Sequence, residues 1–201
     1  MLICKNICNR FDWHFDIFNV TESAILLLIL PFVFWGSPHW FYENGIAENL
    51  QIISLIAAVY LCLTAKRHRE LFVVFAFIAL SCILREINMG RSIFCRIYFK
   101  NAAECRWPMF KYGYLADIGW SLIIATAMGY MLRHEIWKSL WKFVTCAPIY
   151  VWDISFIIIA ALIAIYAEIP SVSNEIMEES AETVMYVSCA ICLYKYRRVV
   201  V

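Results

Sequence analysis

Long apolar runs separated by short charged or proline-containing stretches dominate the pattern of hydrophobic and polar positions along the chain. A helix needs about 20 mostly apolar residues to cross roughly 30 Å of bilayer hydrocarbon. Runs approaching that length predict spans at about residues 24–42, 47–64, 71–89, 114–132, 149–168 and 178–196. The fifth span has the alternative of starting near Trp141 with a bend at Pro148. The pattern therefore predicts an all-α fold, a polytopic membrane helix bundle formed as a single unit by residues 23–198.

Composition supports this class and excludes others. Of 201 residues, 63% are hydrophobic and only 16% are charged, and the mean hydropathy is +0.70. Soluble domains contain about 45–50% apolar residues, so too little polar surface is left here to cover a soluble globule. The formal net charge of +1 leaves no basic domain to neutralise phosphates, and we expect no direct contact with nucleic acid.

The distribution of Lys and Arg predicts the orientation. Cations concentrate at the two chain ends and in the connections around residues 66–69 and 133–142, whereas the stretches 36–49 and 169–181 contain no Lys or Arg. Cation-rich loops remain cytoplasmic, which puts both termini inside. The loop at 90–113 is basic yet must lie outside if six spans are present; four or five spans would move it. We expect a multi-pass protein of the bacterial cell inner membrane.

Residues 1–22 predict a separate element. Ile7, Phe11, Phe15 and Phe18 recur at spacings of three and four, with polar residues on the other faces. This periodicity predicts an amphipathic helix lying in the cytoplasmic interface, with a docking face for a partner as the alternative. The first span itself is expected to start at residues 21–23, where a Thr and a Ser provide a helix-start signal.

The positions of the cysteines and histidines do not predict a metal or cofactor site. Most cysteines fall in or beside apolar runs, where we expect them to pack as small side chains. Cys95 and Cys105 share the outer loop, and a disulfide between them is expected if that side is oxidising. The four histidines are scattered without the spacing of a zinc or haem site, so neither a metal nor a cofactor is predicted.

Small residues recur at helical spacing in two of the predicted spans. Ser121, Ala125 and Gly129 follow one another every four residues in the fourth span, and Ala160 and Ala164 do so in the fifth. Stripes of small residues let membrane helices approach one another closely. We therefore predict that these residues form helix-packing faces, within the chain or between copies of it.

Carboxylates gather at the outer ends of the predicted spans. Glu86 and Glu168 lie at helix C-termini, where the helix dipole disfavours an anion by a few tenths to about 1 kcal/mol, so each needs a cation or a proton. Arg85 and Arg91 are the available cations. The predicted polar cluster consists of Arg85, Glu86, Asp117, Glu168 and Glu182, with Glu43 and Glu48 at its rim.

Two interpretations of that cluster remain open. A structural ion-pair network is favoured, because acidic residues at helix N-termini can act simply as caps. The alternative is a site for a cation, a proton or a lipid head group. Asp153 lies apart on the inner half of the fifth span, where we expect a hydrogen bond to a Trp or Tyr of a neighbouring helix rather than a proton relay.

These observations favour a non-catalytic membrane subunit. Such a protein would act as a sensor or anchor, form homo-oligomers in the lipid bilayer and couple to a cytoplasmic protein partner, for example in a bacterial stress or antiviral defence system. One alternative is a channel or a proton- or cation-coupled transporter using the outer carboxylates. Another is an intramembrane lipid-modifying enzyme with a carboxylate acid/base pair.

Overall fold

A computed structural model describes residues 10–35, 46–87, 114–169 and 175–199 of the 201-residue chain. Two short strands lie among the helices, β1 (Phe11–Asp12) and β2 (Ile149–Tyr150). The helices of this described part are α1 (Ile17–Trp35), α2 (Ile46–Leu63), α3 (Arg69–Glu86), α5 (Tyr114–Arg133), α6 (Ile136–Cys146), α7 (Val151–Ala167) and α8 (Glu175–Tyr196). The predicted all-α class is confirmed.

Most helix boundaries lie near those expected from hydropathy. Helix α1 is the exception at its start, since it begins at Ile17 rather than near residue 24. The fifth apolar run is divided at Pro148 into the amphipathic helix α6 and the longer apolar helix α7. Proline lacks a backbone N–H and restricts the residue before it, and Ala147 is accordingly extended at the end of α6.

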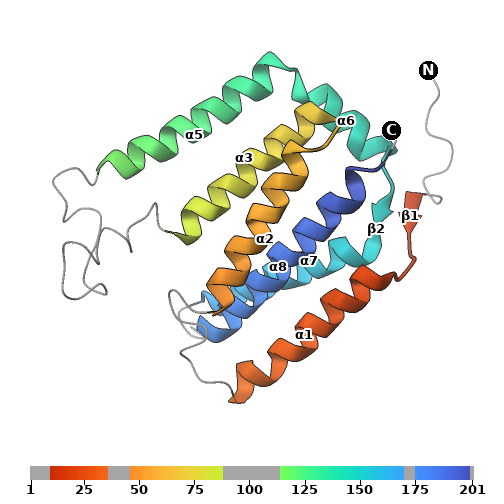
Figure 1. The fold of residues 1–201 in the computed structure, drawn as a ribbon, viewed down its shortest axis with the longest axis vertical. Helices are drawn as coiled ribbons and strands as arrows, with labels where there is room; N and C mark the ends of the chain where they lie inside the picture. The colour runs from red at the N-terminus through yellow and green to blue at the C-terminus, as the bar shows by residue number, and fades with distance from the viewer. Residues whose placement is uncertain (1–9, 36–45, 88–113, 170–174, 200–201) are drawn as a thin grey trace.

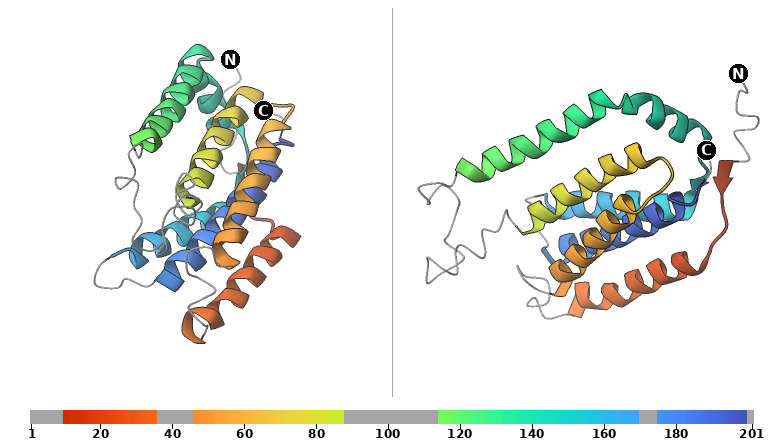
Figure 2. Two further views of the ribbon diagram at one scale, coloured as in Figure 1. Left: turned by 60° about the vertical axis from the view of Figure 1, so that its left-hand side comes forward. Right: turned by 45° about the horizontal axis from the view of Figure 1, so that its top comes forward.

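Helix α8 lies at the centre of the bundle (Figure 1). It packs against α7, α2 and α1, and α3 packs on the other side of α2. Helix α5 lies apart from this group and contacts mainly α3 and α6, so it forms an outer arm of the molecule (Figure 2). Both described chain ends, at Arg10 and Val199, lie at the same end of the bundle as the α2–α3 and α5–α6 connections.

The predicted amphipathic helix over residues 1–22 is wrong for residues 11–16. Phe11 and Asp12 instead form β1, which pairs in parallel with β2 through Phe11 with Ile149 and Asp12 with Tyr150. Residues 13–16 have no regular structure before α1 begins. Hydrogen bonds to a distant segment therefore replace the local helical bonds that the periodicity predicted, while residues 1–9 lie outside the described residues.

Arg10 links the segment 10–16 to the C-terminus of α6 through hydrogen bonds. Its guanidinium donates to the carbonyl of Ala147 at 3.1 and 3.3 Å and also to the carbonyl of Val144. The last carbonyls of a helix lack intrahelical partners and attract cations. A second link follows directly, because the Trp152 indole N–H donates to the carbonyl of Trp13 at 3.0 Å.

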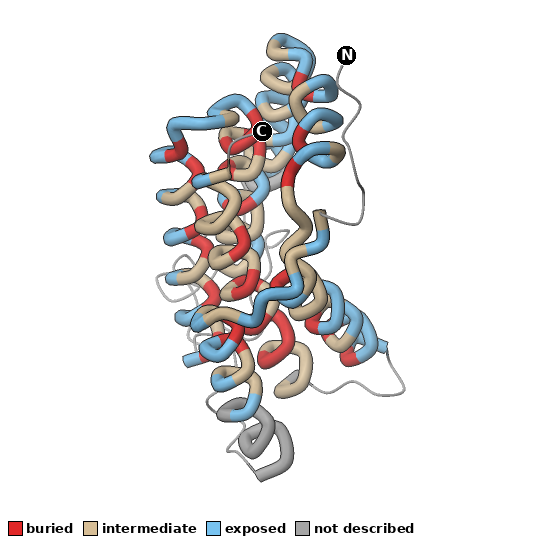
Figure 3. Tube along the Cα trace, turned by 90° about the vertical axis from the view of Figure 1, so that its right-hand side faces the viewer, coloured by how far each residue is buried: buried red, intermediate tan, exposed pale blue. Residues whose placement is uncertain are grey.

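Apolar side chains form the core of the bundle and also cover the outer sides of several helices. Many exposed positions lie on the outer sides of the helices (Figure 3). The large apolar residues that are exposed on α2, α5 and α7 include Ile53, Ile56, Leu122, Met128, Ile158 and Leu162. Buried polar or charged side chains are Asn19, Glu22, Gln51, Asp153, Ser180, Glu182, Thr183 and Ser188. The bundle therefore encloses polar groups and presents aliphatic ones.

By length and composition, one helix among the described residues qualifies to cross a membrane. Helix α2 has 18 residues and a mean hydropathy of 1.8 over them. Shorter apolar helical segments run over Ile17–Leu27, Ile118–Arg133 and Val151–Ala167. The number of spans beyond α2 stays a prediction.

The two small-residue stripes differ in their surroundings. Ala160 and Ala164 of α7 are buried, and α7 packs extensively against α8. Ser121, Ala125 and Gly129 of α5 are all exposed, and a methyl group added at Gly129 would meet nothing within 4 Å. The stripe of α7 thus lies inside the bundle, and that of α5 faces outward.

Candidate functional site

Two polar clusters lie against α8, one toward each of its ends. The first, which we call the Arg85 cluster, consists of Gln51, Arg85, Glu86, Glu179, Glu182, Thr183 and Tyr186. The second, the Lys195 cluster, consists of Asp16, Asn19, Glu22, Asp153, Ser188 and Lys195. Both clusters join α8 to helices that are distant in sequence.

Arg85 is the centre of the first cluster. It lies in the last turn of α3, and its guanidinium contacts Glu86 at 3.0 Å and also pairs with Glu182 of α8. The Tyr186 hydroxyl donates to Oε1 of Glu86 at 3.0 Å, which adds a second link between the helices. The two carboxylates are largely buried, whereas the Arg85 side chain is 53% exposed. An arginine with its charge partly in water thus neutralises two carboxylates enclosed between helices.

Gln51 of α2 extends this cluster toward the start of α8. Its side-chain amide donates to the Glu179 carboxylate at 2.8 Å and to the Glu179 carbonyl at 3.1 Å. A longer contact of 3.4 Å reaches the hydroxyl of Thr183, which itself donates to the Glu179 carbonyl at 2.8 Å. Because Gln51 is fully buried, these bonds satisfy N–H donors that would otherwise be costly to enclose, whereas its side-chain oxygen has no hydrogen-bond partner among the described residues.

The structure brings together three of the seven residues in the predicted polar cluster, namely Arg85, Glu86 and Glu182. Glu48 lies in the first turn of α2, on the side of Glu179. Glu168 is exposed at the end of α7 and close enough to Glu182 to repel it.

The other predicted residues lie outside the described parts. Asp117 belongs to α5, but its side chain is not among those described, and Glu43 and the Cys95–Cys105 pair lie outside the described residues altogether. Whether the cluster is structural or functional stays a prediction.

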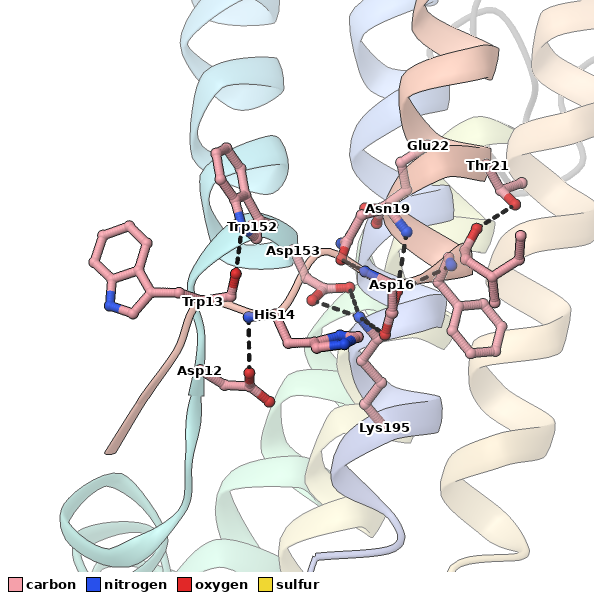
Figure 4. Close-up of polar contacts among 12 residues, drawn as sticks. Asp12, Trp13, His14, Asp16, Asn19, Thr21, Glu22, Trp152, Asp153 and Lys195 are labelled. Atoms are coloured by element: carbon pink, nitrogen blue, oxygen red, sulfur yellow. Dashed lines mark hydrogen bonds and ion pairs between the residues drawn. The ribbon is translucent and has the colours of Figure 1, made fainter. Parts of the chain in front are cut away.

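Lys195 of α8 binds two carboxylates in the second cluster (Figure 4). Its ammonium is 2.7 and 2.8 Å from the two oxygens of Asp153 on α7 and 2.9 Å from Oδ2 of Asp16. The rings of Phe18 and Tyr150 lie 5.7 and 5.4 Å from the same ammonium. Asp153 is therefore not isolated, and the expected Trp or Tyr hydrogen bond is replaced by a buried ion pair that joins α7 to α8.

Asp16 also starts helix α1. Its Oδ1 accepts hydrogen bonds from the backbone N–H groups of Phe18 at 2.9 Å and Asn19 at 3.1 Å. In return, the Asn19 side-chain oxygen accepts from the Asp16 N–H at 3.0 Å, which completes a reciprocal cap. The predicted start at residues 21–23 is wrong because the cap at Asp16, five to seven residues earlier, satisfies the free amides of the first turn.

The pKa of Asp16 is lowered from its ordinary value. Partial burial acts to raise the pKa, but the hydrogen bond from Lys195, the backbone N–H groups of Asn19 and Phe18, and the positive charge of Lys195 outweigh it. The carboxyl therefore remains ionised, as both its capping role and its ion pair require.

Asn19 connects the helix cap to Glu22, the deepest carboxyl of this cluster. Its amide donates to Oε2 of Glu22 at 3.1 Å. Glu22 is 1% exposed and Ser188 of α8 is 0% exposed, and the two side chains interact. Among the described residues, however, neither Oε1 of Glu22 nor the Ser188 hydroxyl has a hydrogen bond of normal geometry.

Sequence reasoning missed the Lys195 cluster. Lys195 and Asp153 are 42 residues apart and come from different helices, so no local spacing connects them. A usable signal was nevertheless present, because a lone Asp near the start of an apolar helix and a lone Lys near the end of another each require a partner when buried. Pairing the two would also have predicted that α7 and α8 are neighbours.

Neither cluster has the ligand geometry of a metal site. Within the described ranges, no group of three or more His, Cys, Asp or Glu residues is placed to hold a metal ion. What the clusters provide is ion pairing between helices and, at Glu22, a buried carboxyl without a cation of its own.

A comparison of the chain with protein-family models, with curated proteins and with solved structures found no match.

Proposed function

We propose that this protein is a multi-pass membrane subunit that self-associates through α5 and couples to a cytoplasmic partner, without catalysing a reaction. The observation that carries the proposal is the outward display of aliphatic side chains on α2, α5 and α7 around a core that contains ion pairs. Contiguous apolar faces of this extent aggregate in water but are compatible with lipid. Buried charges that pair with one another inside a membrane bundle fit the same environment.

The face of α5 supports self-association. Ser121, Ala125 and Gly129 are exposed on a helix that packs only weakly on the rest of the bundle. Small residues gain no packing from lipid, whereas against another helix they permit close backbone approach. A second copy of α5 is the proposed occupant, because the same stripe on both copies gives the self-complementary contact of a two-fold dimer.

The basic end of the bundle supports a cytoplasmic contact. Lys66, Arg67, Arg197 and Arg198 line a pocket of about 330 Å³ formed by the α2–α3 connection and the end of α8. Basic residues of this kind favour the cytoplasmic side of a membrane. A partner with an acidic surface would complement them.

Membrane insertion is tested first, with the chain expressed in a bacterial cell. We expect the protein to stay in the membrane pellet after alkaline extraction and a reporter at its C-terminus to face the cytoplasm. Release into the soluble fraction would contradict the membrane assignment. A C-terminal reporter facing outside would overturn the proposed orientation.

Self-association is tested by oxidative cross-linking in native membranes. Ala125→Cys lies in the small-residue face, whereas its exposed neighbour Thr126→Cys is turned by about 100° around the helix. We expect a cross-linked dimer, above the background of the parent chain, for the first variant and not for the second. Gly129→Leu should reduce the dimer measured in detergent. Equal cross-linking of both cysteine variants would contradict self-association through α5. A protein that stays monomeric at all concentrations would contradict it as well.

The channel or transporter alternative has weaker support. Two of the carboxylates it would use are Glu86, which is ion-paired with Arg85, and Glu168, which is exposed at the end of α7. Glu86→Gln provides a direct comparison, because a transporter would lose conductance or uptake while a structural ion pair would lose stability.

A further inference from the structure

We propose that Glu22 is a proton-binding site: its carboxyl holds a proton at neutral pH and donates it, as a carboxylic acid, to the Ser188 hydroxyl. The inference is independent of the self-association argued above. It rests on the number of charges in the Lys195 cluster, on the geometry around the ammonium and on two buried oxygens without partners.

The cluster contains more carboxyls than its cation can neutralise. An ammonium has three N–H donors. Oδ2 of Asp153 accepts a hydrogen bond from Lys195 Nζ at 2.8 Å, and Oδ2 of Asp16 lies 2.9 Å from the same nitrogen. Oδ1 of Asp153 lies 2.7 Å away as an ion-pair contact without a hydrogen bond of normal geometry. No salt bridge among the described residues reaches Glu22, whose one described donor is the neutral Asn19 amide at 3.1 Å.

The groups that face Glu22 do not favour a third negative charge. From α7, Asp153 repels it, and from α8, Lys195 attracts it but is already committed to two carboxylates. The thiols of Cys189 and Cys192 on α8 also face it, and within α1 its neighbour is Asn19. An ionised carboxylate that is 1% exposed would thus lie among an anion, an ammonium already paired with two carboxylates, two thiols, one amide and one hydroxyl. Under such conditions a carboxyl retains its proton rather than its charge.

A proton on Oε1 of Glu22 gives both Oε1 and the Ser188 hydroxyl oxygen a hydrogen-bond partner. As an acid, Glu22 keeps Oε2 as the acceptor for Asn19 and turns Oε1 into a donor. Ser188 is the side chain of α8 that interacts with this carboxyl, and its hydroxyl oxygen has a free acceptor position. The predicted hydrogen bond from the Glu22 carboxylic acid to Oγ of Ser188 would join α1 to α8 through two uncharged groups.

Proton binding couples the position of α1 to pH. Helix α1 is held against α8 by the Asp16 ion pair and by the Glu22–Ser188 contact. Loss of the Glu22 proton would leave three carboxylates facing one ammonium. The contact of α1 with α8 is then expected to weaken as the pH rises, which makes this end of α1 responsive to the proton concentration.

Infrared spectroscopy of the purified full-length protein tests the proposal directly. A protonated carboxyl gives a C=O stretching band that a carboxylate lacks, and ¹³C-carboxyl glutamate shifts the band of Glu but not that of Asp. We expect a Glu acid band at pH 7 that loses the Glu22 component in Glu22→Gln, seen in the difference between the two spectra. The matched control is Glu179→Gln, which removes a half-buried carboxyl of the Arg85 cluster and should leave the Glu22 component in place.

A second variant keeps the test decisive if Glu22→Gln does not fold. Ser188→Ala should retain the acid band but move it to the higher frequency of a carboxyl that donates no hydrogen bond. Absence of any Glu acid band at pH 7 in the parent protein would overturn the proposal. So would a Glu acid band of unchanged intensity in Glu22→Gln, and an unshifted band in Ser188→Ala would overturn the assignment of the acceptor.

Discussion

The two polar clusters along α8 set one cation against three carboxyls each, yet they differ in their access to water. The Arg85 side chain is 53% exposed, whereas that of Lys195 is 8% exposed. Water reaches the cation of the first cluster but hardly that of the second, so enclosing the cation costs less in the first. Two clusters with the same number of charged groups therefore differ in hydration. The cation at one end of α8 is partly hydrated, and the cation at the other end is almost fully enclosed.

The chemistry of the two cations fits this difference. Arginine presents a planar fork that can bind two carboxylates while part of it stays in water, and Arg85 does so with Glu86 and Glu182. Lysine is a compact charge, and Lys195 is surrounded by two carboxylates and two aromatic rings. If the comparison is correct, substitutions in the enclosed cluster will have the larger effects.

Lys195→Met is expected to be the most damaging change. It removes the cation and leaves the Asp153 carboxylate, 2% exposed, without a partner, which costs about 3–5 kcal/mol for a buried ion pair. Thermal unfolding in detergent measures the loss. The double variant Asp153→Asn with Lys195→Met should recover much of it, because the remaining carboxylate without a cation, that of Asp16, is 30% exposed and reached by water. Equal destabilisation by the single and double variants would contradict the ion pair as the cause.

Arg85→Gln should have a smaller effect, about 1–2 kcal/mol. The glutamine retains a donor for Glu182, and the charge it removes is already partly in water. The same unfolding assay applies, with Arg69→Gln, exposed at the start of α3, as the control for loss of an arginine. A loss as large as that of Lys195→Met would break the contrast between the two clusters.

Asp16→Ala is expected to cost about 1 kcal/mol or somewhat more, because it removes the helix cap of α1 together with one contact of Lys195. Asp16→Asn separates the two contributions, since asparagine caps as well as aspartate but carries no charge. Retention of most of the stability in Asp16→Asn would assign the effect to the cap. Identical losses in both variants would assign it to the ion pair.

The smallest expected effect is a dependence on acid. The lowered pKa of Asp16 means that its contribution is fully present above its unfolded-state value of about 3.9 and is lost as the pH falls through the folded-state value. Unfolding midpoints collected across acidic pH should therefore decline less steeply for Asp16→Asn than for the parent chain. Parallel pH profiles for the two proteins would rule out this contribution.

Sequence patterns predicted the helices well because apolar runs and their charged boundaries are local properties. Helix α2, expected at about 47–64, spans Ile46–Leu63, and the break at Pro148 divides α6 from α7. The segment before α1 was predicted wrongly, since the periodicity around Phe11 and Phe15 is compatible with a helix, whereas its partner Ile149 is far along the chain.

The candidate site was predictable only in part for the same reason. Arg85 and Glu86 adjoin each other at a helix end, and that local signal pointed to an ion pair. The sequence did not single out Glu22, because its burial depends on how α1 packs against α8. Packing between distant helices is a tertiary property that hydropathy does not encode.

The attachment of the first residues to later ones also determines the order of assembly. Arg10 binds carbonyls 134 and 137 residues further along, so these bonds cannot form until α6 has been synthesised. The ion pair of Asp16 forms later still, because its partner Lys195 belongs to α8, which follows α6 and α7 in the chain. During synthesis the start of α1 must therefore remain without its final contacts while the intervening helices fold. Helix α8, which is synthesised after the other described helices, completes the cluster that holds α1 in place.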